Sequence, residues 1–142
     1  MKVLYITYEN VFRTAILQAM VLKPLCIMSQ CFGTKFVVTS SVKGFERDET
    51  YHKSKEAEYH NNIRVKEFVK ELAGRRSIIT FLLDIFPLLV FSIREARVSD
   101  VIHCRSYGAA IVGFLASIIV KKPFIFDMRG SIGEKFPAMG IL

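Results

Sequence analysis

The loop that follows the first apolar segment contains no glycine. Residues 2–8, KVLYITY, have the β-branched and aromatic composition of a strand, and YENVFRTA comes next at residues 8–15. Dinucleotide-binding and P-loop proteins need glycine at this point so that backbone N–H groups can approach phosphate closely. The sequence therefore excludes both kinds of site. A receiver domain is disfavoured too, because a single Glu9 stands where that class has a cluster of acidic residues.

Cysteine is scarce. The three cysteines, Cys26, Cys31 and Cys104, form an odd number and have no CxxC spacing. Two of them lie in apolar sequence, which favours buried, reduced thiols in a reducing compartment. We expect neither a disulfide framework nor a metal site.

No uninterrupted apolar run is long enough to cross a bilayer. The best candidate, residues 78–93, falls short of the roughly 20 residues that a spanning helix needs, and it contains Asp84 and Pro87. The N-terminal segment has neither a signal-peptide core nor a cleavage site. We therefore expect a cytoplasmic protein in which residues 78–93 form a buried or surface-seeking helix.

Basic residues outnumber acidic ones by 20 to 13, which gives a net charge of +7 and favours an anionic partner. Nine of the basic residues lie between Lys43 and Arg76, next to the apolar residues 78–93. This combination suits a peripheral position on the inner face of an anionic membrane. A solvated loop before a core helix explains the same pattern, and both interpretations stay open. Nucleic acid is not expected as a partner, because no recognisable reading motif interleaves aromatic with basic residues.

Strands alternate with helices along the 142 residues, a length sufficient for one domain with a sizeable core. Strand patterns occupy residues 2–8, 35–42, 62–68, 100–106 and 121–130. Helical spacing marks residues 10–30, with Asn10 as N-cap and Pro24 as a kink or break, and then residues 78–96 and 107–120. The polar residues 43–62 predict an exposed loop. This order predicts an α/β domain with a doubly wound parallel sheet of the Rossmann-like kind.

Polar residues close the well-defined strands. In a doubly wound sheet ligands bind outside the carboxyl ends of the strands, so these residues are candidates for one site. They are Glu9, Asn10 and Arg13 after the first strand, Ser40 and Ser41 at the second, His103, Arg105 and Ser106 at the fourth, and Asp127, Arg129 and Gly130 at the fifth. The opposite strand ends carry ordinary surface lysines. The asymmetry predicts a site at the carboxyl edge.

Structural roles stay open for these residues. Asp127 and Arg129 point the same way on an extended strand, and could pair with each other or cap helices. His103 fits a core histidine bonded to a carbonyl, and Glu9 fits a helix cap. Arg105 is harder to assign to the core, because a guanidinium at the end of a buried strand needs an anion or several acceptors.

Two motifs, DVIHCRSYGAAIVGFLAS at residues 100–117 and KKPFIFDMRG at residues 121–130, resemble the N-terminal domain of family 4 retaining glycosyltransferases, which have the GT-B fold. Residues 2–20 also resemble the opening of such enzymes. The resemblance implies a hexosyltransferase that uses a nucleotide sugar, as in the synthesis of cell-envelope polysaccharide. In this family the N-terminal domain holds the acceptor, here a glycan or a lipid-linked acceptor. The resemblance implies no cofactor beyond the donor substrate.

The resemblance also assigns roles to the strand-end residues. Asp127 and His103 are implied as the catalytic pair that orients the attacking oxygen. The implied substrate-binding residues are Arg129, Arg105, Ser106, Gly130, Glu9, Asn10 and Arg13. Many relatives have a histidine where Arg105 stands.

The second domain of the family, which grips the donor with paired glutamates, has no counterpart in these residues. We therefore expect residues 1–142 to be an N-terminal piece that is inactive by itself. The donor-binding domain would come from a missing segment or from a separate chain. A non-catalytic flavodoxin-like module that binds a nucleotide or phosphate is the alternative.

Overall fold

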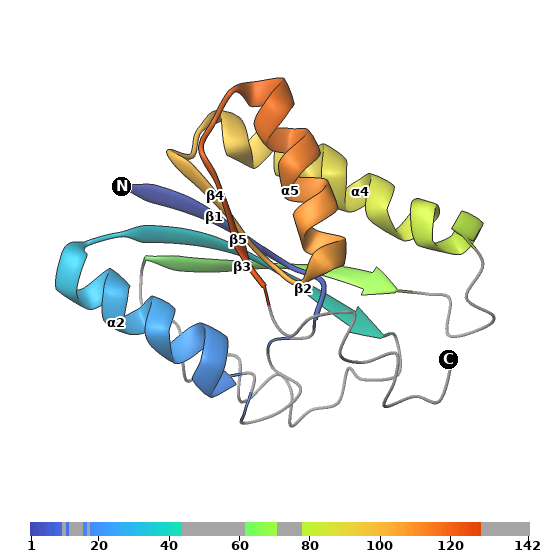
Figure 1. Ribbon diagram of the computed structural model, residues 1–142. Coiled ribbons are helices and arrows are strands. Elements are labelled where there is room, and N and C mark those ends of the chain that lie inside the picture. The colour runs from blue at the N-terminus through green and yellow to red at the C-terminus, as the bar shows by residue number, and fades with distance from the viewer. Residues whose placement is uncertain (10, 12–15, 17, 44–61, 71–77, 129–142) are drawn as a thin grey trace.

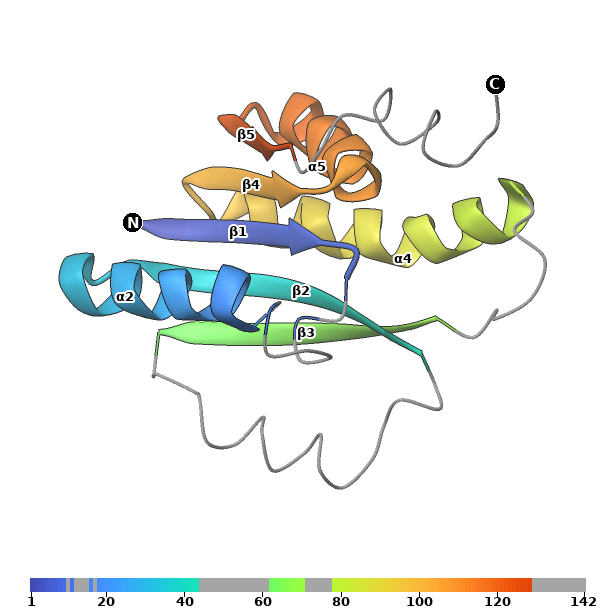
Figure 2. The ribbon, with the colours of Figure 1, turned by 60° about the horizontal axis from the view of Figure 1, so that its bottom comes forward.

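Five parallel strands form one sheet in the computed structural model, which describes residues 1–9, 11, 16, 18–43, 62–70 and 78–128. The strands are β1 (Lys2–Thr7), β2 (Lys35–Lys43), β3 (Ile63–Lys70), β4 (Val101–Arg105) and β5 (Phe124–Asp127). They lie in the order β3-β2-β1-β4-β5, which can be followed in Figure 2. The predicted doubly wound parallel sheet is confirmed.

The helices are η1 (Gln18–Leu22), a π-helical segment, α2 (Lys23–Phe32), α4 (Ile78–Arg97) and α5 (Tyr107–Val120). The helix expected over residues 10–30 is divided, because η1 passes into α2 at Pro24, which has no N–H for a helical hydrogen bond. α2 ends at Gly33, whose φ of 61° is the left-handed conformation that glycine adopts most readily. The proposed N-cap, Asn10, lies outside the described residues.

Helices cover both faces of the sheet. α2 packs on one face, and α4 and α5 lie side by side on the other (Figure 1). Along β1, Val3 and Tyr5 point to the α2 face while Leu4 and Ile6 point to the α4–α5 face. A strand that is buried on both faces reads as a continuous apolar run, which explains the composition of residues 2–8. Among the helices of the described ranges, none combines the length and apolarity needed to cross a membrane.

The three cysteines are free and differ in burial. Cys104 lies in the core of the α4–α5 face, where burial raises the pKa of its thiol to about 12. Cys26 is half-buried. Cys31 is exposed near the end of α2, so of the three cysteines Cys104 alone is fully buried. Most of the loop expected over residues 43–62 lies outside the described residues.

At the amino edge of the sheet the polar groups pair with one another. The Lys2 ammonium lies 3.2 Å from a Glu95 carboxylate oxygen, and the Lys2 backbone N–H donates to Asp100 Oδ2 at 2.7 Å. These contacts tie β1 to the end of α4 and the start of β4. Lys2, Glu95 and Asp100 therefore have a structural role at the amino edge.

The carboxyl edge contains the topological switch point. From β1 the chain moves outward to β2 and β3, whereas from β4 it moves to β5 on the other side. β1 pairs with β4 as far as Thr7 opposite Arg105, but its register with β2 ends at Tyr5 opposite Val38. Doubly wound sheets bind their ligands at the point where the strand order reverses. In this chain that point lies at the ends of β1 and β4.

Candidate functional site

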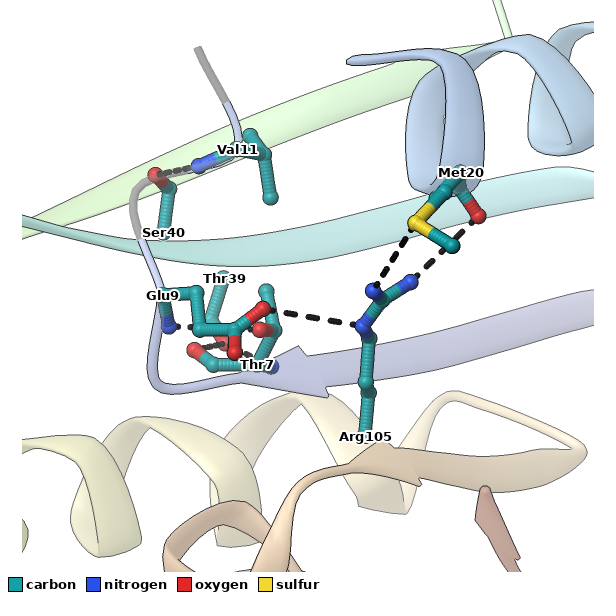
Figure 3. A network of polar contacts seen from close by, with 7 residues as sticks. All are labelled: Thr7, Glu9, Val11, Met20, Thr39, Ser40 and Arg105. Carbon is teal, nitrogen blue, oxygen red and sulfur yellow. Dashed lines mark hydrogen bonds and ion pairs between the residues drawn. The ribbon is translucent and has the colours of Figure 1, made fainter. Parts of the chain in front are cut away.

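Arg105 ends β4 at the switch point and is buried, with only 4% of its surface exposed. Its Nη1 donates to the Met20 carbonyl at a long 3.4 Å, and its Nη2 lies 3.8 Å from the Met20 sulfur, a weak acceptor (Figure 3). Its Nε lies 3.6 Å from Glu9 Oε2, and within the described part of the chain neither of these two atoms has a hydrogen-bond partner. A guanidinium has five N–H donors, so this one is buried with most of its donors poorly satisfied.

The Met20 carbonyl, which accepts from Arg105, lies where the helix is interrupted. Pro24, four residues further on, has no N–H to donate in the α-helical pattern, and η1 is π-helical here. The Arg105 guanidinium donates to this carbonyl. A helix break and a buried arginine from distant parts of the sequence thus fix one side of the site.

Hydroxyl groups hold the start of the loop after β1. Thr39 Oγ1 accepts from the Thr7 N–H at 3.0 Å and donates to the Thr7 carbonyl at 3.1 Å, so it replaces the ladder bonds that β2 no longer makes. Ser40 Oγ accepts from the Val11 N–H, and Thr7 Oγ1 accepts from the Glu9 N–H, both at 3.2 Å. These bonds place Glu9 beside Arg105, as Figure 3 shows.

Ser106 links β4 to α5 with an unusual backbone. Its φ of 76° and ψ of 156° lie in a region that is essentially restricted to glycine. Its side chain makes no capping hydrogen bond to α5, although its carbonyl accepts from the Ala110 N–H at 2.9 Å. Strained residues of this kind cost about 1–3 kcal/mol and cluster at functional sites. The strain lies directly after Arg105.

His103 and Asp127 lie on neighbouring strands of the same edge. Asp127 is the register partner of Arg105, and His103 stands two residues before Arg105 on the same face of the sheet. Burial lowers the pKa of His103 below its ordinary 6.5, and the Asp127 carboxylate offsets part of this effect. The imidazole is therefore neutral at pH 7, with the edge of its ring packed against Tyr5 at a centroid distance of 4.8 Å.

A cavity of about 470 Å³ opens on the α2 face beside these two residues. α2 leaves part of β4 and β5 uncovered, and Ile125 on that face is half exposed. Apolar side chains make most of the cavity wall: Met1, Val3, Met20, Val21, Leu25, Met28, Phe36, Val101 and Ile125. His103 and Asp127 add polar atoms toward the carboxyl edge. A cavity with apolar walls and a few polar groups is the usual form of a small-molecule site.

The structure brings together four of the residues that the sequence singled out: Glu9, His103, Arg105 and Asp127. Ser106 lies next to them in the β4–α5 turn. Ser40 is not a strand-end group, because β2 continues to Lys43 and the buried Ser40 hydroxyl bonds the loop backbone. Asn10, Arg13, Arg129 and Gly130 lie outside the described residues. Among the described residues no group of three or more His, Cys, Asp or Glu side chains is placed to hold a metal ion.

Sequence reasoning missed Thr7 and Thr39. Both are fully buried, and they set the path of the loop rather than face a ligand. The sequence does show a threonine near the carboxyl end of each of these two strands. Its role depends on the separation of β1 from β2 at this point, which the sequence does not show.

The fold and the strand-end cluster define a Rossmann-like α/β domain with its candidate site at the switch point. Neither a family model nor a curated protein sequence matches the chain. Among solved structures it is similar to Anabaena Alr3699/HepE in complex with UDP and glucose, with a TM-score of 0.54 and 21% identity over 89% of this chain. The same protein in complex with UDP-glucose gives 0.54 and 19%, and in complex with UDP 0.51 and 19%.

At these identities the likeness is one of fold. The domain shares the α/β fold of a part of the HepE structures, while the GT-B assignment and membership of family 4 stay predictions. The chain spans about 29% of the length of the HepE structures.

Proposed function

We propose that the chain is the acceptor-binding part of a glycosyltransferase that moves a hexosyl group from a nucleotide sugar to a glycan or lipid-linked acceptor. The observation that carries the proposal is the poorly satisfied guanidinium of Arg105, buried at the switch point beside Glu9. At the opposite edge Lys2 and Glu95 pair at 3.2 Å, whereas among the described residues Arg105 Nε has only the longer 3.6 Å contact with Glu9. A phosphate or diphosphate on the acceptor would supply one.

The proposed roles follow from chemistry and position. An incoming anion replaces the half-exposed Glu9 carboxylate and accepts from Arg105. Asp127 accepts a hydrogen bond from the acceptor hydroxyl, and the neutral His103 can accept a second, so that together they orient the attacking oxygen. The apolar wall of the cavity would hold an apolar part of the acceptor. Asn10, Arg13, Arg129 and Gly130 keep the substrate-binding roles that the resemblance implies.

The donor side of the reaction is proposed to lie on a domain that these 142 residues do not supply. The chain matches only a part of the HepE structures, so we expect no turnover without such a domain. We place the complete enzyme on the cytoplasmic side of the membrane, in the synthesis of cell-envelope polysaccharide.

Anion binding tests the proposal directly. The ¹⁵N-labelled chain is titrated with a short-chain prenyl diphosphate sugar and, separately, with the same sugar without diphosphate. We expect the diphosphate compound alone to shift the amides of residues 7–9 and 103–106. A charged hydrogen bond contributes roughly 1.5–3 kcal/mol, so Arg105→Met should weaken binding by about tenfold or more. Glu9→Gln, which removes the competing carboxylate, should strengthen it.

The matched control is Arg64→Met, which removes an exposed arginine on β3 and should leave the affinity unchanged. Equal affinities for the wild type and for Arg105→Met would contradict the proposal. So would shifts confined to other parts of the sheet.

A transfer assay tests whether the chain needs a separate donor-binding domain for turnover. The purified chain is incubated with UDP-sugars and GDP-sugars and with candidate acceptors, and we expect no steady transfer. Sustained transfer by the chain alone would show that it is not merely the acceptor half. A flavin or nucleotide held tightly by the purified protein would instead favour the flavodoxin-like binding module.

A further inference from the structure

α5 turns its small residues toward the sheet and its large apolar residues away from it. The buried residues of this helix are Ala109, Val112, Gly113, Ala116 and Ser117. Its exposed residues include Ile111, Phe114, Leu115, Ile118 and Ile119, which are 41–57% exposed. A surface helix normally shows the reverse arrangement, with the apolar face inward and polar residues outward. The outer face of α5 is therefore built to meet a second apolar surface.

α4 presents a matching stripe beside it. Leu83, Phe86 and Val90 follow one another at spacings of three and four residues, which puts them on one side of the helix, and they are 38–66% exposed. The same spacing continues to Arg94 and Arg97, which are also exposed. The outer stripe of α4 is thus apolar over most of its length and cationic at its C-terminal end.

The two helices combine these features into one face. Both return the chain to the start of a parallel strand on the same side of the sheet, so their C-terminal ends lie at the amino edge (Figure 1). Lys121 and Lys122 follow the end of α5 there, Lys121 exposed and Lys122 half-buried. Glu95, the acidic residue of that end of α4, is paired with Lys2 and is mostly buried. The eight exposed apolar side chains therefore border on four cations at one end.

We propose that this face, made of the outer sides of α4 and α5 with Arg94, Arg97, Lys121 and Lys122, docks on the surface of an anionic lipid bilayer. Apolar side chains of an interfacial helix enter the boundary between headgroups and acyl chains, and cations attract anionic headgroups. A second copy of this chain, which has a net charge of +7, would bring no excess of negative charge to these cations, whereas anionic headgroups would. The described helices are too short or too polar to cross the bilayer, so the contact is with its surface.

The inference is independent of the proposed anion site, because it uses neither Arg105 nor the cavity. It keeps the apolar residues 78–93 of the contact that the sequence left open, but replaces the basic residues 43–76 by cations at the other end of α4. The N-terminal ends of α4 and α5 lie at the carboxyl edge, whereas the cavity opens on the α2 face of the sheet. The docking face and the candidate site therefore lie on opposite faces and meet only at the carboxyl edge.

Co-sedimentation with vesicles tests the docking face. The chain is mixed with vesicles of phosphatidylcholine alone and of phosphatidylcholine with phosphatidylglycerol. We expect stronger binding to the anionic vesicles, weakened by salt. Phe114→Gln with Ile118→Gln should reduce binding to both kinds by about tenfold, since each buried CH₂ group contributes to insertion. Arg94→Gln with Lys121→Gln should lower the affinity for the anionic vesicles by about tenfold. It should leave the affinity for phosphatidylcholine vesicles unchanged.

The control variant carries Ile27→Gln with Phe32→Gln. These residues are also exposed, at 58% and 77%, but they belong to α2 on the opposite face. The control should bind vesicles like the wild type, and circular dichroism should show the same helix content for all variants. Equal binding to both kinds of vesicle, or equal losses for the α5 and α2 variants, would overturn the proposal.

Sedimentation velocity without lipid tests whether a second copy of the chain covers the docking face instead. If the wild type is a dimer that Phe114→Gln with Ile118→Gln dissociates, and no vesicle binding is found, the face is an interface between two copies and the proposal is wrong. Failure of the vesicle test leaves the Arg105 titration unaffected, because that titration contains no lipid.

Discussion

Arg105 and Pro24 are distant in the sequence but act on the same carbonyl oxygen, that of Met20. The sequence could single out Arg105, because a guanidinium at the end of a buried strand requires acceptors. It could not identify the acceptor, a carbonyl of the π-helical segment η1 four residues before Pro24. At the scale of single residues, the candidate site could be predicted as a set of polar groups but not as a set of contacts.

Ser106 allows a test of strain in the β4–α5 turn. Glycine adopts the backbone conformation of Ser106 without steric cost. Ser106→Gly should therefore recover part of the strain energy of about 1–3 kcal/mol and raise Tm. Ser106→Ala keeps the Cβ that causes the strain and should not raise Tm. Thermal unfolding followed by circular dichroism measures both. Equal Tm values for the glycine and alanine variants would show that the turn stores no strain.

α5 is the element whose bounds the sequence predicted best, because the apolar residues 107–120 lie between Ser106 and the two lysines. The sequence indicated less clearly which side of α5 packs on the sheet. A helix that is apolar on all sides has little periodicity, and only the small residues at 109, 113 and 116 indicate the side that packs closely. The helix over residues 10–30 shows the opposite case: its periodicity was clear, yet Pro24 divided it into η1 and α2.

Two glycines of α5 should respond to alanine with opposite signs. A Cβ at Gly113 would collide with Cys104 Sγ and lie 3.1 Å from Phe124 Cε2, so Gly113→Ala should cost about 1–3 kcal/mol and lower Tm. A Cβ at Gly108 would meet Tyr8 Cδ1 at an ordinary 3.8 Å. Gly108→Ala should therefore gain up to about 1 kcal/mol from helix propensity. Urea unfolding of both variants gives the comparison, and a stabilised Gly113→Ala would contradict the close packing of α5 on β4.

At the scale of the whole molecule, the sequence predicted the class of fold and the edge of the sheet that gathers the polar residues. Near-continuous apolar strands alternating with helices leave few other arrangements. The cavity was not predictable in this way. It exists because α2 covers only a part of its face, and the coverage of a face depends on the positions of all the strands and helices together.

Cys104 should report on opening of the whole core. In a variant with Cys26→Ser and Cys31→Ser, we expect a thiol reagent to modify Cys104 only through the unfolded state, at a rate that rises with urea. Modification in the native state would require the thiolate, and the buried thiol has a pKa of about 12. The labelling rate should therefore level off near the ordinary thiol pKa of 9.0 as the pH is raised. A rate that kept rising toward pH 12 would indicate access to the folded core.

The place of β1 in the sheet has a consequence for how the protein is made. Of the five strands β1 is synthesised first, yet it lies between β2 and β4, and its ladder with β4 joins Val3 to Val101 and Thr7 to Arg105. Until β4 has been synthesised, one side of β1 has unpaired backbone N–H and C=O groups and is open to other strands. Such long-range parallel pairing forms slowly. During synthesis β1 therefore needs protection from other strands, because its second neighbour, β4, is made long after β2.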